Sequence, residues 1–411
     1  MSDVRVDGSR FRERFESFNE IGATEAGGVN RPALSDENRE ARDTLVEWFE
    51  DAGLSVTVDE MGNIFGRREG ANPDLAPVLF GSHVDSQYNG GRFDGVVGVL
   101  GALEVVETLN DADETTERPL EVVAWSNEEG VRFQPDMLGS GVFCDVFDRE
   151  YAYSREDKDG NRFGEELERI GYRGEAPCEP RDLHCYFEVH VEQGPFLEQE
   201  ELPVAAVEGV FGFSWMNVSF EGQANHAGPT PMDMRHDALV GASDVIQAVR
   251  RITATGGVDL VGTVGSLDVW PNAINVIPET VELTVDFRSY DDAAVDAAVE
   301  QIEAEIAHAA EREGLDYEFE QIMRVDADPF DADCIETVVD AIEECGHDYT
   351  RLVSGAGHDA NYLNTICPTS MIFVPSVDGI SHRESEFTEW EDVLVGTDVL
   401  LGAVRRKANE S

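Results

Sequence analysis

The chain has 411 residues, and its 85 acidic side chains outnumber the 30 basic ones to give a formal net charge of −55. Such a negative chain is a poor partner for nucleic acid or an anionic membrane, because both repel it. The hydrophobic content of 41% predicts a folded protein rather than a disordered one. Salt would screen the repulsion between the acidic side chains, so we expect a salt-rich cytoplasm, as in a halophile.

The length predicts more than one domain. The stretch from Met1 to Asn19 is charged throughout and has no apolar signal-peptide core. We find no apolar run long enough to cross a bilayer. The six cysteines form no C-x-x-C pair, which is typical of reduced core residues. These features lead us to expect a cytoplasmic protein.

The first part of the chain alternates between helical and strand patterns. Apolar spacing predicts helices over residues 10–22 and 35–53, with Ser35 as the N-cap of the second. Short strands are expected at residues 55–59 and 63–67. A buried strand at residues 78–80 then leads through a Gly-rich loop into a helix over residues 95–109.

Potential metal ligands follow three of the predicted buried strands. His83 and Asp85 come after the first strand at alternate positions, so both side chains leave the backbone on the same side. Glu128 and Glu129 follow the strand at residues 121–125, and His190 lies in the strand at residues 185–191. Adjacent glutamates are usually solvated surface charge, but the ends of strands in α/β sheets are where ligands bind.

The character of the chain changes near residue 209. Strands are expected at residues 214–221, 260–267 and 281–288, and helices at 237–251 and 291–314. This order predicts a small α/β sandwich inserted into a larger α/β domain. We place the boundaries at 1–208, 209–324 and 325–411, with a strand at 372–375 and a closing helix at 392–407 in the last part.

The candidate ligands are histidines and carboxylates, the types that borderline divalent metals take: His83, Asp94, Glu129, His190 and His382. Five ligands, one of them a carboxylate able to bridge, suit two metals roughly 3.5–4 Å apart. Asp85 is placed to accept the second ring N–H of His83. Glu128 is then left beside the metals as a base that can take a proton from water.

The motifs around these residues occur in a characteristic order: G-S-H-V-D-S, G-x-x-D-G-x-x-G, N-E-E-G, H-V-E-Q-G-P, N-H-A-G-P-T-P-M, N-V-I-P, D-F-R, S-G-A-G-H-D-A and G-I-S-H-x-x-x-E. In this order they resemble the hydantoinase/carbamoylase branch of the M20-type dinuclear metallo-amidohydrolases. That branch includes N-carbamoyl-L-amino acid hydrolases, allantoate amidohydrolases and β-ureidopropionases. The likeness covers nearly the whole chain.

The resemblance implies a fold and a metal centre. It implies a mixed-sheet, peptidase-like catalytic domain of the α/β class with an inserted small α+β sandwich that acts as a lid and a dimerisation domain. It implies that His83, Asp94 and His190 hold one metal, that Asp94 bridges, and that Glu129 and His382 complete the second. Glu128 is implied to be the general base. His190 favours this branch over related peptidases, which place an acidic residue there.

The resemblance also implies residues that bind the substrate. His226 is implied to reach the active site of the partner subunit and stabilise the oxyanion. Gln193, Asn275 and Arg288 are implied to hold the substrate, with Arg288 on its carboxylate, and the loop at Gly357 is expected to contact it through backbone N–H groups. Without the resemblance, His226 would be read as a turn residue and Arg288 as part of a surface ion pair.

The predicted function is hydrolysis of a linear ureido C–N bond in a carboxylate-bearing substrate, with two Zn²⁺, Mn²⁺, Co²⁺ or Ni²⁺ ions per subunit of a homodimer. One alternative is an N-acyl amino acid deacylase or small dipeptidase on the same scaffold. Another is a metal-dependent binding protein without turnover, which would have no need of Glu128 as a base.

Overall fold

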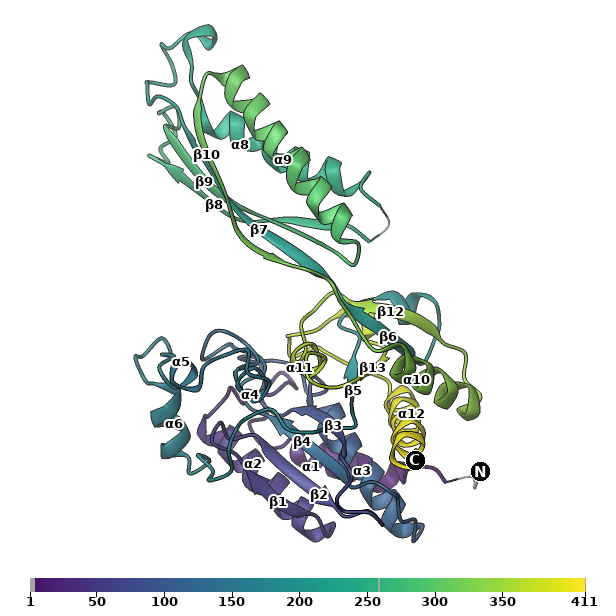
Figure 1. The fold of residues 1–411 in the computed structure, drawn as a ribbon. Coiled ribbons are helices and arrows are strands. Elements are labelled where there is room, and N and C mark those ends of the chain that lie inside the picture. Colours follow the sequence, from purple (N-terminus) through teal and green to yellow (C-terminus); the bar gives the residue numbers. More distant parts are fainter. Residues whose placement is uncertain (1–3, 258, 411) are drawn as a thin grey trace. The chain divides into compact units, whose positions relative to one another are not determined.

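The computed structural model describes residues 4–257 and 259–410. It divides into two compact units, Met1–Glu208 with Phe330–Ser411 and Gly209–Pro329 (Figure 1). The outer ends of our predicted domains, residues 1 and 411, lie outside the described residues. The second of these units ends at Pro329, and its last long strand ends at Val325, one residue beyond the predicted boundary at 324.

The first unit is built on a mixed sheet, as the α/β prediction requires. Its strands are β1 (Ser55–Val58), β2 (Ile64–Arg68), β3 (Val78–His83), β4 (Leu120–Trp125), β5 (Cys185–Val191), β6 (Ala205–Val210), β11 (Asp328–Pro329), β12 (Thr350–Ser354) and β13 (Thr369–Val374). The order is β1-β2-β4-β3-β5-β13-β6-β11, with β12 paired to β6. The central strands β4, β3, β5 and β13 are parallel, and the strands on both sides are antiparallel. The carboxyl ends of the parallel strands therefore share one edge of the sheet.

The helices of the first unit lie before, between and after these strands in the chain. They are α1 (Gly8–Phe18), α2 (Asp36–Asp51), α3 (Val96–Asp111), α4 (Leu138–Phe143), α5 (Arg149–Tyr153), α6 (Phe163–Arg169), α7 (Phe196–Gln199), α10 (Ala332–Cys345), α11 (Asp359–Leu363) and α12 (Trp390–Ala408). Helix α3 lies between β3 and α12 and is buried on almost every side. Ser35 caps α2 by accepting a hydrogen bond from the backbone N–H of Asn38, as predicted.

The second unit is a four-stranded antiparallel sheet with two helices packed against it (Figure 1). Its elements are β7 (Gly212–Glu221), α8 (Ala238–Thr253), β8 (Val261–Trp270), β9 (Thr280–Ser289), α9 (Asp292–Glu313) and β10 (Asp316–Val325). The strand order is β10-β7-β9-β8. Apolar side chains of α8 and α9 and one face of the sheet form its core, which includes Val245, Phe287 and Ile302.

Several elements were not predicted from the sequence. Strand β10 was missed: its side chains are mostly exposed, although Tyr317, Phe319, Met323 and Val325 place apolar residues at alternate positions. Helix α10 was also missed, although Asp331 is a good N-cap that accepts hydrogen bonds from the backbone N–H groups of Asp333 and Cys334.

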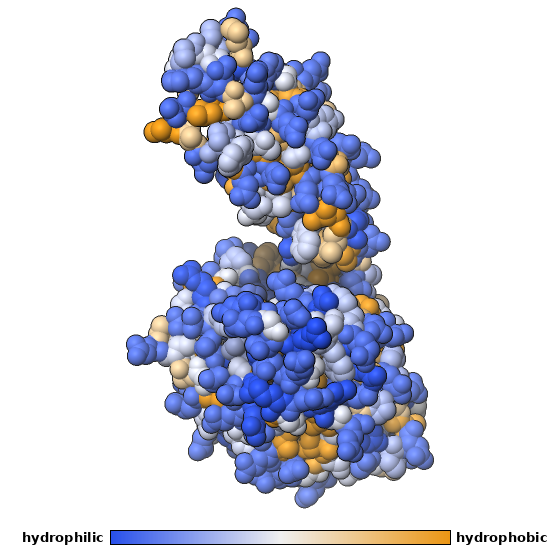
Figure 2. Space-filling model, turned by 90° about the vertical axis from the view of Figure 1, so that its left-hand side faces the viewer, coloured by the Kyte–Doolittle hydropathy of each residue, from blue (hydrophilic) through white to orange (hydrophobic). Residues whose placement is uncertain are grey.

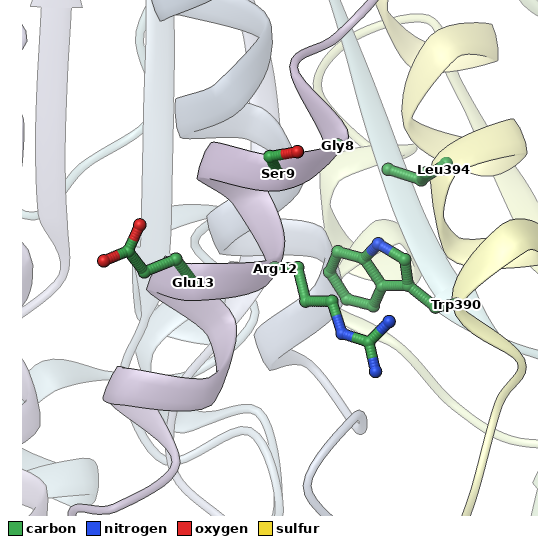
Figure 3. A pocket seen from close by; sticks show the side chains of 6 residues that line it. All are labelled: Gly8, Ser9, Arg12, Glu13, Trp390 and Leu394. Carbon is green, nitrogen blue, oxygen red and sulfur yellow. The ribbon is translucent and has the colours of Figure 1, made fainter.

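The first and last helices of the first unit pack on each other through aromatic side chains. The Trp390 ring of α12 lies 5.0 Å from the Phe11 ring and 5.6 Å from the Phe15 ring of α1, measured between centroids. A shallow pocket between the two helices is lined by Arg12 and Leu394, and the Arg12 guanidinium lies 5.7 Å from the Trp390 ring centroid (Figure 3). This contact ties the two ends of the chain to one unit.

Hydrophilic side chains cover most of the face shown in Figure 2. Most acidic residues are exposed, so the net charge of −55 is largely a surface charge. In the part of the chain that the structure describes, no helix combines the length and apolar character that a membrane span requires.

This surface charge predicts a strong dependence of stability on salt. Raising KCl from 0.1 M to 1 M shortens the screening length from about 10 Å to about 3 Å, which weakens the repulsion in the folded protein. We expect the thermal unfolding midpoint to rise over this range, measured by circular dichroism with free metal held constant. An unchanged or lower midpoint in 1 M KCl would show that charge repulsion does not limit the stability of the fold.

Candidate metal centre

The candidate ligands gather at the carboxyl edge of the parallel strands. Strand β3 ends at His83, and His190 is the sixth residue of the neighbouring parallel strand β5. The turn after β4 presents Glu128 and Glu129. Because β4, β3 and β5 run in the same direction side by side, the three polar segments meet at one edge of the sheet.

The carboxylate of Asp94 lies close to two buried histidines, His190 and His83. Its Oδ1 atom lies 3.0 Å from Nε2 of His190 and 3.5 Å from Nε2 of His83. The His83 and His190 ring centroids are 6.0 Å apart. All three side chains are buried, and their ligand atoms lie within 4.8 Å of one another.

The other carboxylate oxygen of Asp94 faces a second group of candidate ligands. Nε2 of His382 lies 3.4 Å from Asp94 Oδ2 and 3.7 Å from Glu129 Oε2. Asp94, Glu129 and His382 form a second cluster within 4.8 Å, and the His382 side chain is 50% exposed. Asp94 therefore belongs to both clusters and faces each with a different oxygen atom. The Oε2 atom of Glu128 lies 3.4 Å from Nε2 of His83.

Unusual backbone conformations accompany the site. Asn127, Gln193 and His382 adopt positive φ angles of 59°, 58° and 58°, and non-glycine residues accept this conformation mainly where function or packing requires it. Gly95 also has a positive φ, and a Cβ there would lie 2.4 Å from the His83 ring. The backbone therefore brings Asp94 and His83 closer together than a larger residue would permit.

The charges in the site depend strongly on one another. Burial alone would lower the pKa of His83, but Glu128, Asp94 and Asp85 raise it well above its ordinary value. Burial opposes the charge on Asp94, yet the neighbouring His190 and His83 side chains hold its pKa well below the usual range. Burial and neighbouring carboxylates raise the pKa values of Glu128 and Glu129.

The residues present fit divalent metal ions. Among the described residues, the buried Nε2 atom of His83 has no hydrogen-bond partner, although it faces Asp94 and Glu128. A buried polar atom without a partner is costly, and a cation between these groups would satisfy it. Two histidine-carboxylate clusters that share one Asp match the ligand types of zinc, manganese, cobalt and nickel.

Asp85 plays a different part from the one we predicted. Nδ1 of His83 lies 3.0 Å from the backbone carbonyl oxygen of Asp85 but 4.0 Å from its carboxylate. The carboxylate instead accepts hydrogen bonds of 3.3 Å from the backbone N–H groups of both Glu128 and Glu129. Asp85 thus orients His83 through its main chain and the two glutamates through its side chain.

Several neighbours of the site were not identified from the sequence. Gln87 donates hydrogen bonds to both carboxylate oxygens of Glu129, from its backbone N–H at 3.0 Å and from its side chain at 2.6 Å. It continues the alternation of His83 and Asp85, which could have indicated it. The His358 ring packs against the His190 ring with centroids 4.6 Å apart. His358 belongs to the S-G-A-G-H-D-A motif, but its packing against His190 was not predicted.

The predicted substrate residues are divided between the two units. In the first, the Gln193 side-chain amide lies 3.2 Å from Asp94 and 3.3 Å from His382, and Gly357 lies in the loop between β12 and α11. In the second, the backbone N–H of Ala227, next to His226, donates to the Asn275 carbonyl. Arg288 lies on β9, where it pairs with Asp286 at 2.9 Å.

The chain is similar to known hydrolases along nearly its whole length. Residues 79–406 match the model of peptidase family M20/M25/M40. The chain is 43% identical over 404 residues to N-carbamoyl-L-amino-acid amidohydrolase of Rhizobium meliloti, covering 98% of this chain and 97% of the relative. It is 32% identical over 407 residues to allantoate deiminase 1 of Glycine max, with 90% and 83% covered.

A solved structure of a hydantoinase/carbamoylase family amidase from Burkholderia multivorans is 49% identical, with a TM-score of 0.96 and 99% of each chain covered. The chain belongs to peptidase family M20/M25/M40 and to the hydantoinase/carbamoylase amidases within it, as the resemblance of its motifs predicted. It is a hydrolase of carbon–nitrogen bonds other than peptide bonds.

Metal binding at this site should stabilise the fold, because the ions bind the folded protein. At a free Mn²⁺ concentration of a hundred times the Kd, we expect unfolding to become more costly by about 2.7 kcal/mol. The measurement is the thermal midpoint of chelator-treated protein with and without added Mn²⁺. His190→Ala should remove most of the increase, and His308→Ala, which changes a histidine of α9 in the other unit, should keep it. An equal increase in both variants would place the ions elsewhere.

Proposed function

We propose that this M20-family hydrolase cleaves the linear ureido C–N bond of a substrate that carries a carboxylate, such as an N-carbamoyl-L-amino acid or allantoate. The observation that carries the proposal is the pair of clusters that share Asp94, with Glu128 beside them. The names of the relatives support the substrate class, because a carbamoyl amino acid and allantoate both contain a ureido group and a carboxylate.

His83, Asp94 and His190 would hold one ion, and Asp94, Glu129 and His382 the other. Divalent ions at these positions would activate water and polarise the ureido carbonyl group. Zn²⁺, Mn²⁺, Co²⁺ and Ni²⁺ all suit the donor set. Gln87 and Asp85 support the ligands by fixing the carboxylate and the backbone of Glu129.

Glu128 is the proposed general base and acid. Its carboxylate takes a proton from the attacking water and delivers it to the nitrogen that leaves. Its backbone N–H is held by Asp85, so the side chain starts from a defined position. For a carbamoyl amino acid the products are the amino acid, carbon dioxide and ammonia.

Residues of the second unit are proposed to bind the substrate. Arg288 would pair with the substrate carboxylate, since a guanidinium group offers two parallel hydrogen bonds to a planar anion. Asn275 and Gln193 would hold polar atoms of the substrate, together with backbone N–H groups near Gly357. His226, contributed by the partner subunit of a homodimer that forms through the second unit, would stabilise the oxyanion. We further propose that the enzyme works in a salt-rich cytoplasm, as its charge suggests.

A deacylase or small dipeptidase on the same scaffold is the nearest alternative. The proposed function and this alternative are distinguished by assaying hydrolysis of several substrates in molar salt. These substrates are N-carbamoyl-L-amino acids, β-ureidopropionate, allantoate and N-acetyl amino acids. Ammonia release from a ureido substrate supports the proposal, whereas release of free amine from the acetyl compounds alone contradicts it. Metal binding without any hydrolysis would favour a binding protein.

Replacing the proposed base separates proton transfer from metal binding. We expect Glu128→Gln to lower kcat by about 10²–10⁴-fold, because a general base contributes on that order, while the metal content stays at the wild-type value. Glu129→Gln should lower the metal content as well. The two are compared by ammonia release and by elemental analysis. A Glu128→Gln enzyme with wild-type kcat would exclude Glu128 as the base.

Arg288 should determine the preference for a carboxylate. We expect Arg288→Met to lower kcat/KM for an N-carbamoyl amino acid by about 10–100-fold, chiefly through KM, since a hydrogen bond to a charged group contributes about 1.5–3 kcal/mol. Arg251→Met, which breaks an exposed ion pair with Glu305 in the same unit, is the matched control. An equal loss for a carbamoylated amine that lacks a carboxylate would contradict this role.

A further inference from the structure

Glu386 is a buried carboxylate that the proposed chemistry does not use. It is the glutamate of the G-I-S-H-x-x-x-E motif, and only 4% of its surface is exposed. Its Oε1 atom accepts hydrogen bonds of 3.0 Å from the backbone N–H groups of both Phe93 and Asp94. A buried charge is retained only where such partners compensate for its desolvation.

The other oxygen of Glu386 faces the segment that carries His382. The Ser381 hydroxyl lies 3.1 Å from Glu386 Oε2, and it also lies 3.4 Å from Asp94 Oδ2. Ser381 has one proton to donate, and it accepts a hydrogen bond of 3.1 Å from the side chain of Gln193. When that proton goes to Glu386, Ser381 makes no hydrogen bond to Asp94 Oδ2, an atom to which the Gln193 side chain also donates at 3.2 Å.

The loop of Asp94 is shaped to fit this carboxylate. A Cβ at Gly91 would lie 2.0 Å from Glu386 Oε1, so a residue larger than glycine there would displace it. The Phe93 and Phe387 rings pack edge to face, with centroids 5.8 Å apart. Glu386 therefore joins two segments that are 292 residues apart in the chain, and each of them supplies a candidate ligand of the second cluster.

We propose that Glu386 is a positioning residue of the metal centre. It holds the backbone of Asp94 and, through Ser381, the segment of His382 in the arrangement that binds the second ion. It also directs the Ser381 hydroxyl away from Asp94. This inference rests on the proposed metal-dependent function and assigns Glu386 no contact with substrate.

The test compares Glu386→Gln with Glu384→Gln. The glutamine at 386 keeps one acceptor for the two backbone N–H groups, but it presents a donor to Ser381 and so turns the hydroxyl toward Asp94. Glu384 lies in the same loop, and within the described residues its carboxylate accepts no hydrogen bond. Both changes replace a carboxyl group by an amide, so Glu384→Gln controls for the loss of an ionisable side chain in this loop.

Mn²⁺ binding to chelator-treated protein is measured by calorimetry. We expect Glu386→Gln to weaken one of two binding steps by about 10–100-fold, the usual effect of losing a partner that orients a ligand. The unfolding midpoint of the metal-free protein should change little, and kcat should fall at saturating substrate with KM nearly unchanged. Ser381→Ala should weaken the same step, and Glu384→Gln should match the wild type.

Three results would overturn the inference. One is wild-type metal affinity in Glu386→Gln, which would leave the proposed function intact. Another is an equal loss of affinity in Glu384→Gln, which would point to net charge instead of position. The third is a wild-type protein that binds no divalent ion, which would overturn the proposed metal-dependent function together with this inference.

Discussion

The free-energy cost of burying carboxylate groups is the main constraint on this structure. Asp85, Asp94, Glu188 and Asp359 are buried in one region, with Glu128 and Glu129 beside them. Within residues 4–257 and 259–410, none of the six pairs directly with a Lys or Arg side chain. The buried Arg31 and Arg42 favour the charge on Asp85 from a distance, while their hydrogen bonds go to backbone carbonyls, Asn38 and Ser126. Divalent cations would supply the missing positive charge.

The fold brings these buried carboxylates together at one edge of the sheet. Parallel strands end side by side, so residues from distant parts of the chain converge without long loops. Hydrogen bonds from backbone N–H groups then fix the carboxylates: Asp85 holds the turn of Glu128 and Glu129, and Glu386 holds the loop of Asp94. The residues proposed to bind the substrate in the second unit belong to a part of the chain with a hydrophobic core of its own.

The sequence predicted those parts of the site that have a local pattern. His83, Glu129 and His190 were identifiable because each lies near or just after the end of a buried strand, and the α/β class followed from the alternation of elements. The side-chain partner of Asp85 was predicted wrongly, because the choice between its carbonyl and its carboxylate depends on the course of the backbone after β3. The role of Glu386 depends on a contact across 292 residues, which spacing does not encode.

The central claim is that two ions held by clusters sharing Asp94 enable hydrolysis of a ureido bond. It is tested most directly by adding Mn²⁺ stepwise to chelator-treated protein in molar salt and following both bound metal and ammonia released from an N-carbamoyl-L-amino acid. We predict that full activity appears only as the second ion per subunit binds. Full activity in the metal-free protein, or with a single ion, would contradict this claim.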